Sequence, residues 1–191
     1  YWNEAIHPEI DASHTYEADE KISALYMEAG FGFAFTHEKD GVAQGQGALV
    51  SLALSTLYKP TMNWGSGSFY SFSKGVSKQS YPSSQMGSIA LLRQAFYDAK
   101  WYKATDQTER NLSLEALNAQ WHHTSFFYTN DRWEILRAAK IATEFNRTFN
   151  YIGAGDEYGI LDQLKGLKST IVVPINFPKA YDVTDPYVAR Q

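Results

Sequence analysis

The second half of the chain decides the fold: residues 125–174 read SFFYTNDRWEILRAAKIATEFNRTFNYIGAGDEYGILDQLKGLKSTIVVP. The apolar run at 125–128 predicts a short strand, and Asn130 or Asp131 is suited to cap the helix that follows it. Asn146 can adopt the left-handed conformation in which helices commonly end. One face of this helix carries apolar side chains at helical spacing, namely Ile135, Ala138, Ala139, Ala142 and Phe145.

A second unit of the same kind follows directly. Residues 148–152 predict a strand, a Gly-Ala-Gly turn leads into a helix over 156–164, and residues 170–174 predict the last strand. Strands that alternate with helices of this length pair in parallel through right-handed crossovers. The predicted fold class is therefore α/β. A doubly wound nucleotide-binding domain is the alternative, which the missing glycine fingerprint disfavours.

Two further helices precede this part of the chain. Residues 85–102 carry an apolar stripe, and a serine just before them supplies the N-cap. Residues 113–120 predict a shorter helix. Before both lies the stretch 58–84, which has no periodicity and is rich in glycine, serine, proline and aromatic residues. We expect a long loop there whose aromatic side chains pack on another part of the protein.

The N-terminal part repeats the order of helix and strand. A helical stripe begins at Ala18 and ends at Gly30, and residues 31–36 predict a strand. After three further glycines, residues 48–54 predict another. With these segments included, we expect one α/β domain over residues 1–191.

Composition excludes several classes of protein. The chain has 191 residues, of which 44% are hydrophobic and 15% aromatic, so it can bury a substantial core. Its net charge is −4 with acids and bases interspersed, so we expect no nucleic-acid partner. Its apolar runs are too short for a membrane span. The absence of cysteine excludes disulfides and zinc–thiolate sites.

Several segments of the chain resemble one family when they are taken in order. They are WNEAIHPE at 2–9, GFGFAFT at 30–36 with GQGALV at 45–50, SKG at 73–75 with YPSSQMG at 81–87, and ILRAA at 135–139 with IGAGDEY at 152–158. This order resembles imidazolonepropionase-related members of the amidohydrolase superfamily, especially secreted bacterial amidohydrolase-like proteins.

The resemblance implies a partial (β/α)₈ TIM-like barrel whose site lies at the carboxyl ends of the strands. In active relatives, zinc or another divalent metal is held there by a His-x-His pair and further ligands, and it activates water. This sequence has no His-x-His, and Tyr128 stands where the family has a metal-binding histidine. We therefore expect a degenerate site with no metal in this segment. The resemblance also implies a periplasmic or secreted location, and the start at Tyr1 fits a mature or trimmed fragment.

Four residues at expected strand ends are the binding candidates: His37, Tyr128, Asn130 and Asp156. His37 with Glu38 and Asp40 could hold a metal or form an acid–base pair, although a solvated turn closed by Asp40-Gly41 explains the same residues and is favoured. Backbone amides near Asp156 could bind an anion, but helix capping by the two acids there is the better interpretation.

Two other motifs are weaker. Ser71, Ser73 and Ser77 lie near Lys74 and Lys78, an arrangement that permits a Ser–Lys nucleophile but is also ordinary for a polar loop. The pair His122-His123 is poorly suited to hold one ion, because adjacent side chains point in different directions. A polar surface role is the favoured interpretation of that pair.

The leading functional hypothesis is a segment of an amidohydrolase-like protein, related to C–N bond hydrolases, that is inactive by itself. The alternatives are a non-catalytic small-molecule binding module and an assembly module. The expected partner is the remainder of a parent barrel or a second copy of the chain, since a partial barrel exposes apolar strand edges and faces.

Overall fold

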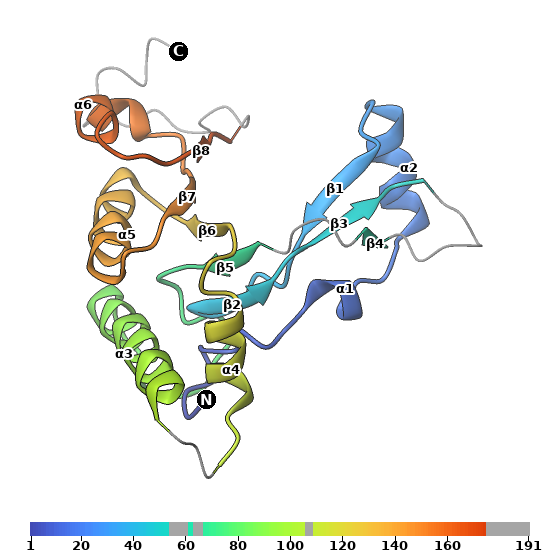
Figure 1. Cartoon of the computed structure of the whole chain (residues 1–191). Coiled ribbons are helices and arrows are strands. Elements are labelled where there is room, and N and C mark those ends of the chain that lie inside the picture. The colour runs from blue at the N-terminus through green and yellow to red at the C-terminus, as the bar shows by residue number, and fades with distance from the viewer. Residues whose placement is uncertain (54–60, 63–66, 106–108, 175–191) are drawn as a thin grey trace.

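A computed structural model of the chain describes residues 1–53, 61–62, 67–105 and 109–174. Its main body is a five-stranded sheet in the order β2-β5-β6-β7-β8 (Figure 1). Strands β5 to β8 run parallel, whereas β2 is antiparallel to β5. The bounds are Ala43–Gln46 for β2, Ser68–Tyr70 for β5, Ser125–Tyr128 for β6, Phe149–Ile152 for β7 and Ile171–Val172 for β8. The predicted α/β class with a mostly parallel sheet is confirmed.

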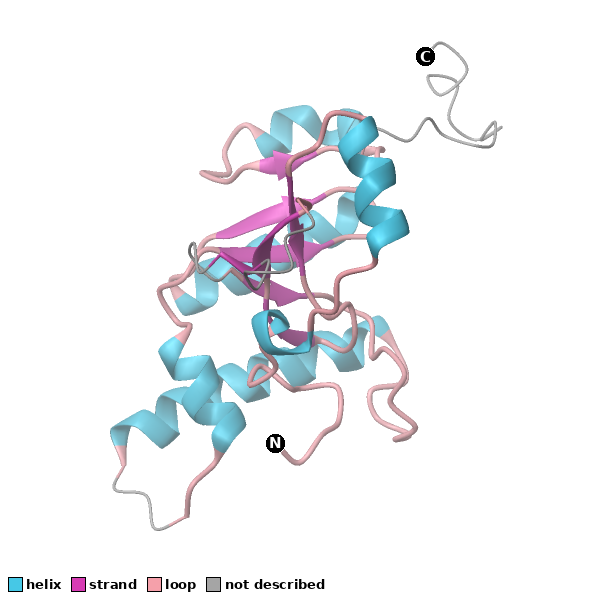
Figure 2. Ribbon diagram, turned by 90° about the vertical axis from the view of Figure 1, so that its right-hand side faces the viewer, coloured by secondary structure: helices cyan, strands magenta, loops and turns pink. Residues whose placement is uncertain are grey.

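Three helices pack against this sheet (Figure 2). They are α3 (Gln85–Ala104), α4 (Leu112–Ala119) and α5 (Arg132–Phe145). The caps expected from the sequence are present: Ser84 and Asp131 accept from backbone amides at the starts of α3 and α5, and Asn146 ends α5 in the left-handed region at φ 52°. Aromatic side chains fill the core between helices and sheet, among them Tyr70, Phe96, Phe127, Phe149 and Tyr151.

The two faces of the sheet differ in burial. Along β6 and β7, alternate side chains such as Phe127 and Phe149 point to the helices and are fully buried. The side chains between them are only half-buried, and they include Phe126, Tyr128 and Ile152. A parallel sheet normally has both faces covered, so the second face of this sheet is incompletely covered by the described residues.

An arm extends from the body and is built differently from the prediction (Figure 1). Strands β1 (Phe33–Thr36), β3 (Ala48–Ser51) and β4 (Thr61–Met62) form a separate antiparallel sheet. Helices α1 (Ala12–Thr15) and α2 (Glu20–Glu28) accompany it. The expectation of parallel β/α units over 31–54 was wrong. Parallel pairing needs a long crossover, and the segment that links β1 to β3 contains β2 and no helix.

Gly47 marks the passage from the body to the arm. It alone separates β2, in the body sheet, from β3, in the arm. A Cβ at this position would lie 2.6 Å from the Phe69 ring and 2.9 Å from the Phe35 ring. Both distances are shorter than real contacts, so a larger residue at this crossing of two sheets would have to displace the two rings.

Two other expectations need correction. The stretch 58–84 is not one loop, because β5, a central strand of the body sheet, begins at Ser68. All three residues of β5 are buried, so it lacks the alternation that reveals a strand. Residues 58–60 and 63–66 of that stretch lie outside the described residues. The helix expected over 156–164 is a 3₁₀ turn, Glu157–Ile160, followed by one turn of α-helix, α6 (Leu161–Leu164).

Candidate functional site

The carboxyl ends of β5 and β6 carry an aromatic cluster, here called the strand-tip cluster, formed by His37, Phe69 and Tyr128. His37 follows β1 and lies flat on the Phe69 ring, with ring centroids 3.8 Å apart and planes 6° from parallel. Its Nε2 lies 3.2 Å from the Tyr128 hydroxyl. Two of the four candidates from the sequence, His37 and Tyr128, are thus in direct contact.

The hydrogen bonds of His37 define its tautomer. Nδ1 lies 2.9 Å from the backbone carbonyl of Glu38, which can only accept, so Nδ1 carries the proton. Nε2 then accepts from the Tyr128 hydroxyl. Burial lowers the pKa of His37 and raises the pKa of Tyr128. Both shifts favour the neutral forms, in which the phenol donates to the imidazole.

A cation and a further aromatic ring complete this cluster. Lys39 Nζ lies 4.5 Å from the centroid of the Tyr128 ring, within the range of a cation–π contact. Phe126 stacks on Phe69 with centroids 5.1 Å apart. The cluster therefore combines an apolar aromatic surface, a neutral hydrogen-bonded pair and one exposed positive charge. Such a surface can bind a flat or apolar group that also carries a negative charge.

Asn130 has a structural role in the described residues. Its backbone amide donates to the Glu134 carboxylate at 2.8 Å, and its side-chain amide lies 3.2 Å from the same group. Gln85, at the start of α3, donates to the other oxygen of Glu134 at 2.5 Å. The Glu134 side chain is buried and links the starts of α3 and α5. Asn130 belongs to this link and lies apart from the contacts of the strand-tip cluster.

Asp156 and Glu157 follow the end of β7. The Glu157 carboxylate accepts from the backbone amides of Ala154 and Gly155, so it occupies the position that an anion would take there. Asp156 makes no capping bond, and its Oδ1 is buried without a hydrogen-bond partner among the described residues. The expected capping of the helix by the two acids was therefore wrong: only Glu157 binds backbone amides, and these amides lie in the turn before the helix.

The Asp40-Gly41 turn and the serine- and lysine-containing loop make ordinary contacts within loops. Asp40 Oδ1 accepts from the Val76 amide at 2.8 Å, and Gly41 adopts φ 82°, as a turn requires. Ser71 donates to the Gly41 carbonyl. Lys74 Nζ donates to the Gln79 carbonyl at 3.0 Å, and among the described residues no hydrogen bond joins Lys74 or Lys78 to a serine hydroxyl. The geometry thus gives no Ser–Lys nucleophile there.

The donors at the strand tips do not fit the divalent metal that the resemblance implies. Across the described ranges, no three His, Cys, Asp or Glu side chains are grouped closely enough to hold an ion. His37 uses both ring nitrogens in hydrogen bonds. Tyr128 is kept neutral by burial, and Glu157 is bound to backbone amides. We derive no catalytic step through a metal from these residues.

Two residues with unusual environments, Lys39 and Arg147, carry no local sequence signal that reveals them. Lys39 follows His37 by two positions, and its place over Tyr128 depends on a contact between distant segments. Arg147 lies at the other end of the sheet, where its guanidinium is buried among aromatic rings. The only signal for Arg147 was its position immediately after the helix-ending Asn146, and this did not predict burial.

The fold places the chain among α/β proteins with a mostly parallel sheet. Among solved structures, it is similar to an amidohydrolase from Thermotoga maritima MSB8. The TM-score is 0.79 and the sequence identity 19%, over 95% of this chain and 52% of that chain. The chain thus spans about half the length of that structure, and the likeness concerns the fold. No family model matches the sequence, and no curated protein matches it.

No helix among the described residues combines the length and hydropathy that crossing a membrane would require.

Proposed function

We propose that this chain is a segment of an amidohydrolase-like protein, related to C–N bond hydrolases, and that it binds no catalytic metal by itself. The observation that carries the proposal is the chemistry at the strand tips. Where metal-dependent relatives need imidazole and carboxylate ligands, this chain has a hydrogen-bonded His37–Tyr128 pair on an aromatic surface. The fold similarity at 19% identity supports the origin.

The finer form of the proposal is a partial (β/α)₈ barrel of the imidazolonepropionase-related kind. Three features support it. The helices lie on one face of the sheet, as in the outer ring of a barrel. The half-buried row of Phe126, Tyr128 and Ile152 lies on the other face, which in a barrel would be the packed interior. The two-residue strand β8 lies at the edge of the sheet, where a further strand could pair.

Metal analysis of the purified chain tests the central claim. The protein is incubated with excess zinc or manganese, desalted, and analysed by inductively coupled plasma mass spectrometry. We expect far less than one ion per chain. The matched variant is His37→Ala: stoichiometric metal in the wild type that disappears in this variant would place a metal site at the strand tips and overturn the proposal.

A second candidate function is non-catalytic binding of a small molecule at the strand-tip cluster. The exposed Lys39 over the Tyr128 ring favours it, because an ammonium beside an aromatic surface suits a ligand with an apolar body and a carboxylate. A thermal-shift screen with dipeptides, sugars and aromatic carboxylates provides the test. We expect stabilisation by aromatic carboxylates that is lost in Lys39→Ala. Equal shifts in wild type and variant would contradict the assignment.

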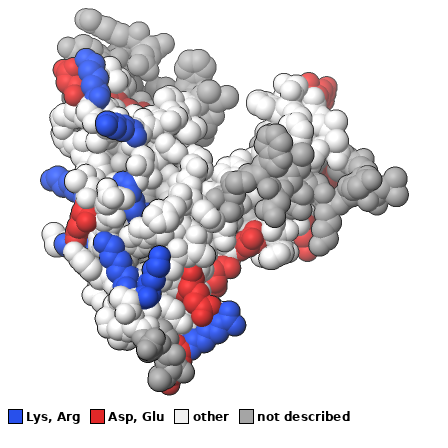
Figure 3. Space-filling view, viewed as in Figure 1, with Lys and Arg blue, Asp and Glu red and all other residues white. Residues whose placement is uncertain are grey.

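The exposed apolar surface of the arm favours an assembly role. Helix α2, strand β1 and the segment between them carry four apolar side chains that are between 49% and 65% exposed: Leu25, Tyr26, Phe31 and Phe33. Figure 3 shows the arm standing apart from the body, with few charged atoms on the visible face. We propose that the rest of a longer amidohydrolase-like protein covers this surface, because the compared structure has as much chain again beyond the matched half.

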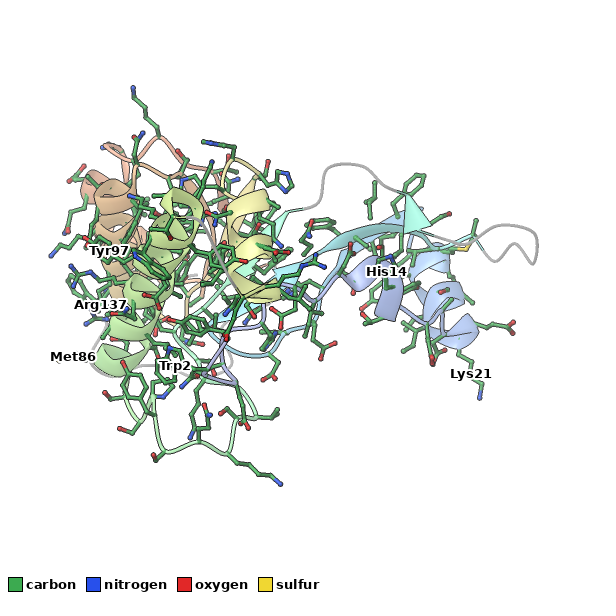
Figure 4. The ribbon with its side chains drawn as sticks, turned by 60° about the horizontal axis from the view of Figure 1, so that its bottom comes forward. Trp2, His14, Lys21, Met86, Tyr97 and Arg137 are labelled. Atoms are coloured by element: carbon green, nitrogen blue, oxygen red, sulfur yellow. The ribbon has the colours of Figure 1, made fainter. Side chains whose placement is uncertain are left out.

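Light scattering tests the assembly role on the isolated chain. With its apolar surface uncovered, we expect the chain to self-associate, and we expect Leu25→Lys together with Phe33→Lys to restore a monomer. A control pair, Met86→Lys with Trp101→Lys, changes exposed apolar residues on α3, away from the arm (Figure 4). A monodisperse wild-type monomer would contradict the role, and equal rescue by the control pair would remove the arm from it.

We also propose a periplasmic or secreted location, since the resemblance is to secreted bacterial proteins. Cell fractionation of the native host, followed by immunoblotting, tests this. Detection in the cytoplasmic fraction alone would contradict it.

A further inference from the structure

A pocket of about 340 Å³ lies at the amino ends of β6 and β7, the opposite edge of the sheet from the strand-tip cluster. It is lined by the segment that precedes β6 and the segment that joins α5 to β7, through Trp121, His122, His123, Ser125, Arg147 and Asn150 among others. His122 and His123 are exposed at this pocket, whereas Ser125 and Arg147 are buried. None of the residues that line it is acidic.

Arg147 has an unusual environment at this pocket. It is 9% exposed, and its Nη2 donates to the Ser125 hydroxyl at 2.8 Å. Its Nη1 is buried and has no hydrogen-bond partner among the described residues. No ion pair of Arg147 with a carboxylate occurs in the same ranges. The guanidinium carbon lies 4.8 to 5.6 Å from the centroids of four aromatic rings, those of Tyr70, Phe96, Trp121 and Phe149.

A buried guanidinium of this kind needs a counter-charge. Removing a cation from water is costly unless it is paired and its donors are satisfied. Cation–π contacts offset part of this cost, and the bond to Ser125 satisfies one donor. Neither the cation–π contacts nor the bond to Ser125 supplies a negative charge or an acceptor for Nη1. An anion in the adjacent pocket would supply the charge, and one that reaches the guanidinium would also supply the acceptor.

The geometry points to a binding site for a small oxyanion, such as phosphate or a carboxylate, in this pocket, with Arg147 as its main cationic partner. The imidazoles of His122 and His123 and the side-chain amide of Asn150 line the same pocket and can donate N–H groups to oxygen. A cation is disfavoured, because the pocket has no carboxylate and lies beside a positive charge. The volume suits a single anionic group or a small molecule that carries one.

Isothermal titration calorimetry of the whole chain tests the site directly. Inorganic phosphate and acetate are titrated separately, each against sodium chloride at matched ionic strength, so that the two sources of oxyanion are distinguished. We expect saturable binding of at least one of them. Arg147→Met, which keeps the apolar stem, should weaken it about tenfold or more. The control Lys140→Gln removes an exposed cation from α5 and should leave the affinity unchanged.

A second variant keeps the test decisive if Arg147→Met fails to fold. His122→Ala with His123→Ala changes two exposed residues and should weaken binding about threefold or more. Two results would overturn the proposal: no saturable binding by the wild type beyond that of chloride, or an affinity that the histidine pair and a folded Arg147 variant both leave unchanged. The outcome does not depend on the metal content of the strand tips.

Discussion

The body and the arm of this protein show similar apolar sequence patterns but bury them to very different extents. In the body, Phe96 and Phe149 are fully buried between helices and sheet. In the arm, Leu25 and Phe33 are 65% and 56% exposed, although they belong to a helical stripe and a strand of the same kind. Among its described residues, the arm has only a small core of Ala12, Ala48 and Val50. Periodicity thus shows that a face is apolar, but it does not show what covers that face.

The comparison predicts that equivalent truncations have unequal costs. Phe96→Ala should lower the free energy of unfolding by about 3 to 5 kcal/mol, because the ring packs against Tyr70, Trp121 and Phe145 and leaves a cavity when it is removed. Phe33→Ala, in the arm, should change it by no more than about 0.5 kcal/mol. Urea unfolding followed by circular dichroism measures both. Both are measured at a dilution at which light scattering shows a monomer, because self-association would bury Phe33. Similar costs would then mean that the monomer itself covers this part of the arm.

Substitution of a buried carboxylate in the body should have the next largest effect on the free energy of unfolding. Glu134 is 5% exposed and accepts from the Asn130 amide and from Gln85. In Glu134→Gln, one of these donors faces an NH₂ group, so we expect a loss of about 1 to 3 kcal/mol of unfolding free energy. The matched variant is Glu144→Gln, whose partner Arg93 is exposed, and its cost should be smaller. The reverse order would show that Glu134 does not link α3 to α5.

Removing an N-cap from a helix of the body and from a helix of the arm compares the two regions with a smaller effect, about 1 kcal/mol of unfolding free energy. Asp131 caps α5 in the body, and Asp19 caps α2 in the arm through bonds to Lys21 and Ile22. Asp131→Ala should lower global stability by about 1 kcal/mol. Asp19→Ala should leave global unfolding unchanged and speed hydrogen exchange only at the amides of α2. Exchange measured by mass spectrometry distinguishes the two, and a global effect of Asp19→Ala would join the arm to the cooperative body.

The sequence predicted the parts of the fold that depend on local signals. α3 and α5 have a helical period and a capping side chain at Ser84 and Asp131, and both formed close to their expected bounds. The antiparallel pairing of β1 with β3 was missed, because strand direction is decided by which segments meet. The three-residue strand β5 was missed because it is buried on both faces and flanked by loop-type residues.

In the candidate site, too, local sequence predicted single residues but not the contacts between distant segments. His37 and Tyr128 were each selected because they end or follow an apolar run, and the structure brings them together. Their contacts with Phe69, however, join three segments that are far apart in sequence, and no local pattern contains them. The burial of Arg147 depends likewise on rings contributed by β5, α3 and β7. A prediction from one sequence could find single residues of this kind but not their partners.

The smallest predicted effect concerns the pH dependence of stability at the strand tips, where arm and body meet. Burial lowers the pKa of His37 in the folded protein below its ordinary value of about 6.5. Between the lowered pKa and about 6.5, the unfolded chain binds more protons, so unfolding free energy rises with pH in that window. The contribution of His37 is complete above about pH 6.5 and is lost as the pH falls through its folded pKa.

The variant His37→Phe isolates this contribution, because it keeps a ring that can stack on Phe69 but does not titrate. Urea unfolding of both proteins at about pH 7.5 and about pH 5 gives four free energies, and the other histidines and the carboxylates cancel in the comparison. We expect the wild type to lose more stability on acidification than the variant. An equal or smaller loss would mean that His37 is not held neutral against Tyr128, and that the arm does not seal this corner of the sheet from water.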